Sequence, residues 1–196
     1  MNDDIPPQPA PAVPTDESRR RDWSSIAAII AAAVGLLALV VSAYTAYIQR
    51  QQVRAQVWPY LILTNNDSDH SLNVFNKGVG PAIMRGAVVR VDDKAQADWD
   101  HVLDALGIAK PRHRWISTIH VNVLSPGEHT AILTFPDEDV YKAFRTQAAA
   151  HMRMELCYCS TLGECWDYSD SIFANEPQVS MVAQCAEIPA GDAFQD

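Results

Sequence analysis

Residues 26–48 read IAAIIAAAVGLLALVVSAYTAYI, an uninterrupted stretch of 23 residues without a charged side chain. As an α-helix with a rise of about 1.5 Å per residue, this stretch would extend about 34 Å, enough to cross a hydrocarbon layer of about 30 Å. Trp23 stands at one end and Tyr44 and Tyr47 at the other, where amphipathic rings prefer the headgroup region. The sequence therefore predicts one transmembrane helix, with the lipid bilayer as its partner.

A cleaved signal peptide is the competing interpretation of the same stretch. Residues 19–21 are three arginines, and residues 41–43 read Val-Ser-Ala, which resembles a small-residue cleavage site. The apolar core of a signal peptide is usually about 7–15 residues long, whereas this one continues further. A retained anchor is therefore the favoured interpretation.

The charges beside the helix and the cysteines indicate its orientation. Residues 19–21 place three arginines before the helix, and Arg50 and Arg54 follow it, so the positive-inside rule narrowly favours a cytoplasmic N-terminus. All four cysteines follow the helix, and an even number suits an oxidising compartment. We therefore expect the C-terminal domain to lie outside the cytoplasm.

The net charge of −9 divides unevenly along the chain. Residues 1–48 hold three basic and five acidic side chains, a balance of −2, and the remaining residues hold 12 basic and 19 acidic ones, a balance of −7. Neither part has the basic surface that phosphate neutralisation requires, so nucleic acid is not an expected partner. Residues 1–22 contain five prolines among small and charged residues and are predicted to form a disordered arm.

Seven segments after the helix combine β-branched or aromatic residues with partial alternation, which is typical of short strands. These segments are residues 57–63, 71–75, 82–91, 115–123, 128–135, 151–159 and 165–173. A short helix is predicted over residues 99–106, ended by Gly107, and a second one after Asp137, which can cap its first turn. The expected fold is mainly β, a two-sheet sandwich with two short helical insertions.

This interpretation divides the chain into four parts. They are a Pro-rich arm (residues 1–22), the transmembrane helix with a juxtamembrane extension (23–56), the sandwich (57–175) and a C-terminal tail (176–196).

Three stretches carry a resemblance to a known family. Residues 73–91, NVFNKGVGPAIMRGAVVRV, resemble the N-x-G-x-G-P-A strand-turn-strand of bacterial immunoglobulin-like domains similar to adhesion-related CARDB-type modules. Residues 124–135, LSPGEHTAILTF, are similar to the PGE turn of such modules, and residues 158–166, YCSTLGECW, resemble the closing hairpin of membrane-anchored bacterial proteins of unknown function. The resemblance covers roughly half of the soluble part and implies an immunoglobulin-like sandwich in adhesion or assembly. The helical insertions and four cysteines depart from the plain module.

The turn motif of this resemblance consists of Asn76, Gly78, Gly80 and Pro81. The two glycines can take positive φ, and Pro81 fixes φ where a ladder N–H is not required. A glycine-rich phosphate loop is the alternative, but no GKS or GKT follows and no GxGxxG opens a helix. A structural turn is therefore favoured.

The cysteines are the only clustered reactive residues of the sequence. Cys157 and Cys159 would point to the same face of a strand, because side chains alternate with a period of two. If residues 160–164 form a hairpin loop, Cys159 stands opposite Cys165, which leaves Cys157 to pair with Cys185. Free thiols and a zinc or redox site are the alternatives, although the CxC spacing differs from the CxxC of such centres. We expect disulfides, and neither metal nor cofactor.

No catalytic residue is predicted, because the six histidines are scattered and no serine has a nucleophile-elbow context. The expected function is a non-enzymatic binding or scaffold module that contacts an envelope or membrane protein from the periplasmic side of a bacterial inner membrane. One alternative is a cysteine-based redox or metal-handling protein. Another is an accessory subunit of a membrane complex acting through its helix, where the small residues 31–35 allow close helix approach.

Overall fold

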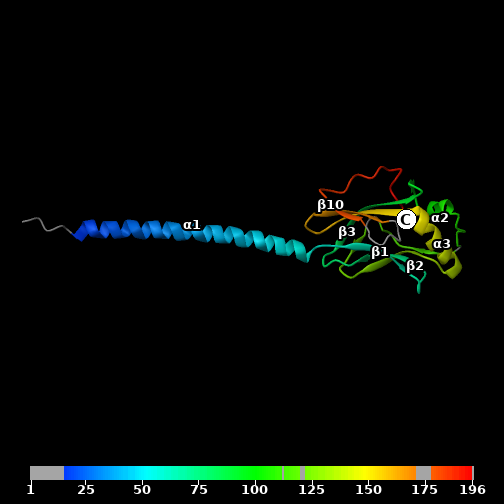
Figure 1. Ribbon diagram of the computed structural model, residues 1–196, viewed down its shortest axis with the longest axis horizontal. Coiled ribbons are helices and arrows are strands. Elements are labelled where there is room, and N and C mark those ends of the chain that lie inside the picture. Colours follow the sequence, from blue (N-terminus) through cyan, green and yellow to red (C-terminus); the bar gives the residue numbers. More distant parts are fainter. Residues whose placement is uncertain (1–15, 112, 120–121, 171–177, 196) are drawn as a thin grey trace, which may run out of the picture. The chain divides into compact units, whose positions relative to one another are not determined.

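The computed structural model describes residues 16–111, 113–119, 122–170 and 178–195, and the chain divides into two compact units, Met1–Gln51 and Gln52–Asp196. Helix α1 (Asp16–Gln56) forms the described part of the first unit and continues into the second (Figure 1). Because α1 begins at Asp16, residues 16–22 are helical, contrary to the predicted arm. The rest of that arm, residues 1–15, lies outside the described residues.

The second unit, hereafter the β domain, contains two antiparallel sheets. The first has the strand order β1-β2-β7-β5, from β1 (Leu61–Asn66), β2 (Ser71–Asn76), β7 (His129–Thr134) and β5 (Trp115–Ile116). The second has the order β10-β9-β8-β3-β4, from β10 (Gln178–Val182), β9 (Cys165–Asp170), β8 (Met152–Cys159), β3 (Ala82–Val91) and β4 (Lys94–Gln96), and β6 (Val123–Leu124) pairs with the start of β3. The expectation of a mainly β fold is confirmed.

The two sheets share one hydrophobic core. Leu72 and Val74 from the first sheet and Val89 and Leu156 from the second are buried in the same cluster. These residues alternate with outward-facing ones along their strands, as the pleat requires. The Tyr168 hydroxyl also joins the sheets, because it accepts a hydrogen bond from the Leu63 N–H (3.1 Å) and donates one to the Asp170 carboxylate (2.8 Å).

Both predicted helices are present, at the same end of the β domain (Figure 1). The first, α2 (Trp99–Ala105), is followed by Gly107 at φ +69°, a left-handed backbone that favours glycine. The second, α3 (Glu138–His151), is capped by the Asp137 carboxylate, which accepts from two backbone N–H groups. At 14 residues, α3 is longer than the short insertion expected.

The predicted strand over residues 115–123 is wrong. Only Trp115–Ile116 and Val123–Leu124 are strands, and they belong to different sheets, so the segment between them passes from one sheet to the other. Residues 120–121 of that segment lie outside the described residues. One strand cannot pair along two sheets, and periodicity alone does not reveal such a crossing.

The C-terminal tail also differs from the expected irregular segment. Its residues 178–182 form β10, which extends the larger sheet beside β9, and Phe194 is buried in the core. Residues 171–177, which include the end of the predicted strand 165–173, lie outside the described residues.

Candidate functional site

The Asn76 side chain forms the centre of the predicted turn motif and is fully buried. Its Oδ1 accepts hydrogen bonds from the N–H groups of Tyr60 (3.2 Å) and Gly78 (2.9 Å). Its Nδ2 donates to the carbonyl oxygens of Gly80 (2.8 Å) and Leu124 (3.0 Å). The amide thus uses both donors and both acceptor positions, which fixes it in one orientation.

The predicted positive φ at Gly78 and Gly80 is wrong, since positive φ occurs instead at glycines 107, 127 and 163. The two glycines are needed for close approach. A Cβ on Gly78 would collide with the backbone N of Tyr60, and one on Gly80 with the backbone of Val57. The motif therefore packs directly against the backbone of the linker, residues 57–60, which connects α1 to β1. Pro81 directly precedes β3, at a position without a ladder N–H.

All four cysteines lie on the outer face of the larger sheet. The structure joins Cys157 to Cys185 and Cys159 to Cys165, the same pairing that strand alternation predicts. The Sγ atoms of Cys159 and Cys185, which belong to different bridges, are 3.9 Å apart. Three of the sulfur atoms are close enough together to ligate one metal ion. Metal binding would require thiolates, and the bridged sulfurs are not available in that form.

Residues 183–195 form a strap that crosses β3 on this outer face, shown in red in Figure 1. The Cys157–Cys185 bridge attaches its beginning, and the Ile188 side chain occupies the space that a Cβ on Gly86 would take. At its end, the Phe194 N–H donates to the Ala87 carbonyl (3.1 Å). The strap thus pairs with β3 between the stretches that β4 and β6 cover.

The aromatic ring of Phe194 anchors the end of the strap. Its centroid lies 5.0 Å from that of Trp99 in an edge-to-face arrangement, which aromatic pairs favour. Both rings are buried. The strap is therefore attached at both ends, covalently at one and by packing at the other.

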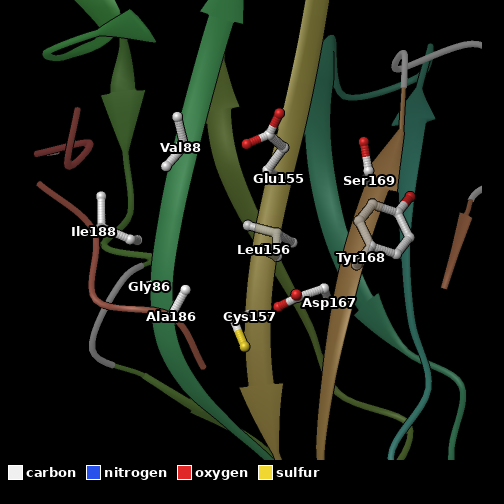
Figure 2. A pocket seen from close by; sticks show the side chains of 10 residues that line it. All are labelled: Gly86, Val88, Glu155, Leu156, Cys157, Asp167, Tyr168, Ser169, Ala186 and Ile188. Carbon is white, nitrogen blue, oxygen red and sulfur yellow. The ribbon is translucent and has the colours of Figure 1, made fainter. Parts of the chain in front are cut away.

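A groove of about 280 Å³ lies on the outer face beside the strap. Figure 2 shows Glu155, Asp167 and Ser169 on neighbouring strands β8 and β9, with Ala186 and Ile188 from the strap on the other side. Burial, followed by the nearby charge of Glu155, raises the pKa of the Asp167 carboxyl. Glu155 pairs with the Arg90 guanidinium (3.2 Å), whereas no ion pair is present for Asp167 among the described residues. The groove thus combines an acidic group, a hydroxyl and apolar walls, a chemistry that suits a basic or amphipathic segment of a partner.

This groove is the feature that sequence reasoning missed. The alternation of β8 contains the signal, since Glu155 and Cys157 occupy successive outward positions of one strand. The contribution of the strap depends on contacts between distant residues, such as Ile188 over Gly86, which no local pattern reveals.

Helix α1 is the remaining candidate feature. Its residues Trp23–Gln56 form one helix long and apolar enough to cross a membrane, and none of its most apolar part is covered by protein. A signal sequence near an N-terminus would have the same properties. The three aromatic residues predicted at the membrane interface, Trp23, Tyr44 and Tyr47, are exposed on this helix.

Comparison with protein-family models, curated proteins and solved structures finds no match to this chain.

Proposed function

We propose that this chain is a membrane-anchored, non-catalytic binding module, held by α1 at the periplasmic face of a bacterial inner membrane, whose immunoglobulin-like β domain contacts an envelope protein. The uncovered apolar surface of α1 carries the proposal. Leu37 and Val41, for example, are 64% and 55% exposed. An apolar surface of this length is costly in water, and the hydrocarbon core of a bilayer would cover it.

The order of the strands supports an immunoglobulin-like module. If β1, β2, β7 and β5 correspond to strands A, B, E and D, the first sheet has the order A-B-E-D. The second sheet then has the order G-F-C-C′ from β9, β8, β3 and β4, with β10 added outside G. This is the arrangement of the immunoglobulin sandwich. The disulfides differ from the inter-sheet bridge of antibody domains, since both lie on one outer face.

The groove is the proposed contact site for the partner. Its Asp167 carboxyl, beside the Glu155 carboxylate that pairs with Arg90 (3.2 Å), favours a Lys or Arg side chain, and the apolar groups of Val88 and Ile188 favour the aliphatic stem of that side chain. A charged contact of this kind selects a partner and orients it more than it adds affinity.

A photo-crosslinking amino acid at Ser169 in intact cells tests this site. We expect one defined protein adduct from Ser169, lost when Asp167→Asn and Glu155→Gln are introduced together. A matched probe at Thr146, exposed on α3, should not give it. Absence of an adduct at Ser169, or the same adduct from Thr146, would contradict the proposed contact.

Two further measurements test the anchor. Protease added to spheroplasts should digest the β domain, and α1 should stay in the membrane after alkaline extraction. A mature chain that begins near Tyr44 and is recovered as a soluble protein would show that α1 is a cleaved signal instead.

The 3.9 Å between the Cys159 and Cys185 sulfurs supports a second candidate function, thiol–disulfide exchange. A protein dithiol that reduces the Cys159–Cys165 bridge, and is itself oxidised, would free a Cys159 thiolate. Attack on Cys185 would form Cys159–Cys185 and release Cys157 as a thiolate, without further electrons. Mass spectrometry after partial reduction should then find the Cys159–Cys185 peptide, and finding native bridges alone would exclude this function.

A further inference from the structure

The exposed large apolar side chains of the β domain are unevenly distributed. Among the described residues outside α1 there are seven, of which two, Trp115 and Ile116, lie on β5. The other five are exposed by 45–68% and gather elsewhere: Trp58, Val79, Val123, Leu162 and Met181.

Strand register places these five at one end of the β domain, hereafter the Trp58 end. The first residue of β1, Leu61, pairs with the last residue of β2, Asn76, so the linker and the 77–81 loop leave the sheet together. At the same end, the first residue of β3, Ala82, pairs with Leu124 of β6. The next residue, Ile83, pairs with Cys159, the last residue of β8. Cys165, which follows the hairpin loop of Leu162, pairs with the last residue of β10, Val182.

Acidic residues concentrate at the opposite end. The β1–β2 and β3–β4 turns and the first turns of α2 and α3 lie there, and they contain residues Asp67, Asp69, Asp92, Asp93, Asp98, Asp100, Asp137, Glu138 and Asp139. The Trp58 end holds two acidic residues, Glu128 and Glu164, and Glu164 pairs with Arg54 (3.1 Å). The loop that contains Val79 also contains Lys77, whose Nζ lies 3.9 Å from the centre of the Phe75 ring. An anionic lipid surface would therefore repel the acidic end and tolerate the Trp58 end.

The chain connection keeps the Trp58 end near the end of α1. The linker is hydrogen-bonded to the β domain, since the Trp58 carbonyl accepts from the Val79 and Gly80 N–H groups (3.0 and 3.1 Å). No free spacer therefore separates Gln56 from the domain. Eight residues, 49–56, separate the apolar stretch from this linker along the chain.

We infer that the Trp58 end rests on the headgroup region of the bilayer that α1 crosses, an inference that depends on the proposed anchor. The Trp58 and Tyr60 rings, with centroids 5.3 Å apart, supply the amphipathic aromatic groups that prefer this region. Val79 and Leu162 supply apolar contact beside them. This contact directs the acidic end away from the lipid and limits the tilting of the β domain.

Site-directed spin labelling of the full chain, reconstituted as one copy per phosphatidylcholine nanodisc, tests the inference. The measured quantity is the ratio of the nitroxide's collision rate with oxygen to its collision rate with a water-soluble nickel chelate, which is high for a label in contact with lipid. The label is attached through an encoded ketone side chain, which leaves the four cysteines bridged. Positions Leu162 and Trp115 compare the two apolar sites, and Ala38 reports on α1. We expect a ratio of oxygen to nickel collisions several-fold higher at Leu162 than at Trp115, and Val79→Asp should lower the ratio at Leu162.

A low ratio at Leu162, equal to that at Trp115, together with a lipid-embedded label at Ala38, would overturn the inference and leave the anchor intact. A water-exposed label at Ala38 would overturn the anchor and the inference with it. Nanodiscs that hold two copies provide a further test. If labels at Leu162 on the two chains broaden each other's spectra and the high collision ratio is lost, a second copy of the chain covers the Trp58 end, and this result would also overturn the inference.

Discussion

The linker and the strap are both peripheral segments fastened to the β domain, but by different chemistry. The linker is held by hydrogen bonds to the turn motif: the Tyr60 N–H donates to the Asn76 amide, and the Trp58 carbonyl accepts from the Val79 and Gly80 N–H groups. The strap is held by the Cys157–Cys185 bridge and by the buried ring of Phe194. The first attachment requires glycines and one amide in fixed positions, whereas the second requires an oxidising environment.

This difference separates two properties of the molecule. The hydrogen bonds that hold the linker do not depend on redox conditions, because they join the backbone and amide groups of Trp58, Tyr60 and Asn76 to the 77–80 loop. One ion pair of the end of α1, Arg54–Glu164 (3.1 Å), reaches the loop that the Cys159–Cys165 bridge closes. The outer face with its groove does depend on redox conditions, because the strap forms one side of the groove.

Asn76→Ala is expected to have the largest effect. Loss of four buried hydrogen bonds, with their partners left unsatisfied, should lower the free energy of unfolding by about 4 kcal/mol. Chemical denaturation of the full chain in detergent measures it. Asn65→Ala is the matched control, because the Oδ1 of that side chain has no hydrogen-bond partner, and it should cost about 1 kcal/mol or less. Equal costs for the two variants would show that the Asn76 network does not stabilise the fold.

The double variant Cys157→Ala with Cys185→Ala should come second. The bridge spans 28 residues, and its loop-closure entropy corresponds to about 3.5 kcal/mol. The matched double variant Cys159→Ala with Cys165→Ala opens a span of 6 residues and should cost about 2.2 kcal/mol. Reductant should abolish both differences from the wild type and leave the effect of Asn76→Ala unchanged. A difference that persists in reductant would assign the cost to packing rather than to the bridge.

The sequence predicts the disulfide attachment of the strap more completely than the hydrogen-bonded attachment of the linker. Alternation on one strand together with a hairpin loop at residues 160–164 predicts the cysteine pairing, because the hairpin register places Cys159 opposite Cys165 and leaves Cys157 for Cys185. Asn76 also carries a local signal, since an Asn side chain that accepts from the N–H two residues later forms an Asx turn. Its bond to the Leu124 carbonyl spans 48 residues and depends on the fold as a whole.

The elements that could not be predicted share one physical cause. Strands β4 and β10 are short or half-exposed, so they show little periodicity, and they form by pairing with strands that already exist. The long strand β3 has the predicted bounds, residues 82–91, because most of its residues are buried and give a strong apolar pattern. Burial of Phe194 also depends on a partner that no local pattern reveals, because the ring packs against Trp99, which lies far away in the sequence.

Phe194→Ala should have a smaller effect than the loss of the bridge. Deletion of the buried ring removes apolar burial worth about 2 kcal/mol. The chain end can move inward, which reduces the cavity that the ring leaves. If the strap acts as one unit, the cost should decrease in the background that lacks the Cys157–Cys185 bridge, because the strap there is already partly detached. A double-mutant cycle of unfolding free energies measures this coupling, and full additivity would show two independent attachments.

Asp167→Asn should have the smallest effect, and its sign is the informative quantity. Burial and the charge of Glu155 raise the pKa of the Asp167 carboxyl, so the ionised group disfavours the folded state above that pKa. The asparagine variant should be slightly more stable than the wild type at pH 7, and the difference should disappear as the pH falls through the raised pKa and then the ordinary one.

Asp67→Asn is the matched variant of opposite sign. Hydrogen bonds from the Tyr141 hydroxyl (2.8 Å) and the Arg145 guanidinium (2.6 Å) lower the pKa of the Asp67 carboxyl. The wild-type carboxylate therefore adds stability above its ordinary pKa and loses it as the pH falls through the lowered one. This variant should be less stable than the wild type at pH 7 and should converge with it in acid. Unfolding curves from pH 7 to acid for both variants decide the matter, since parallel curves would show that neither carboxyl is coupled to folding.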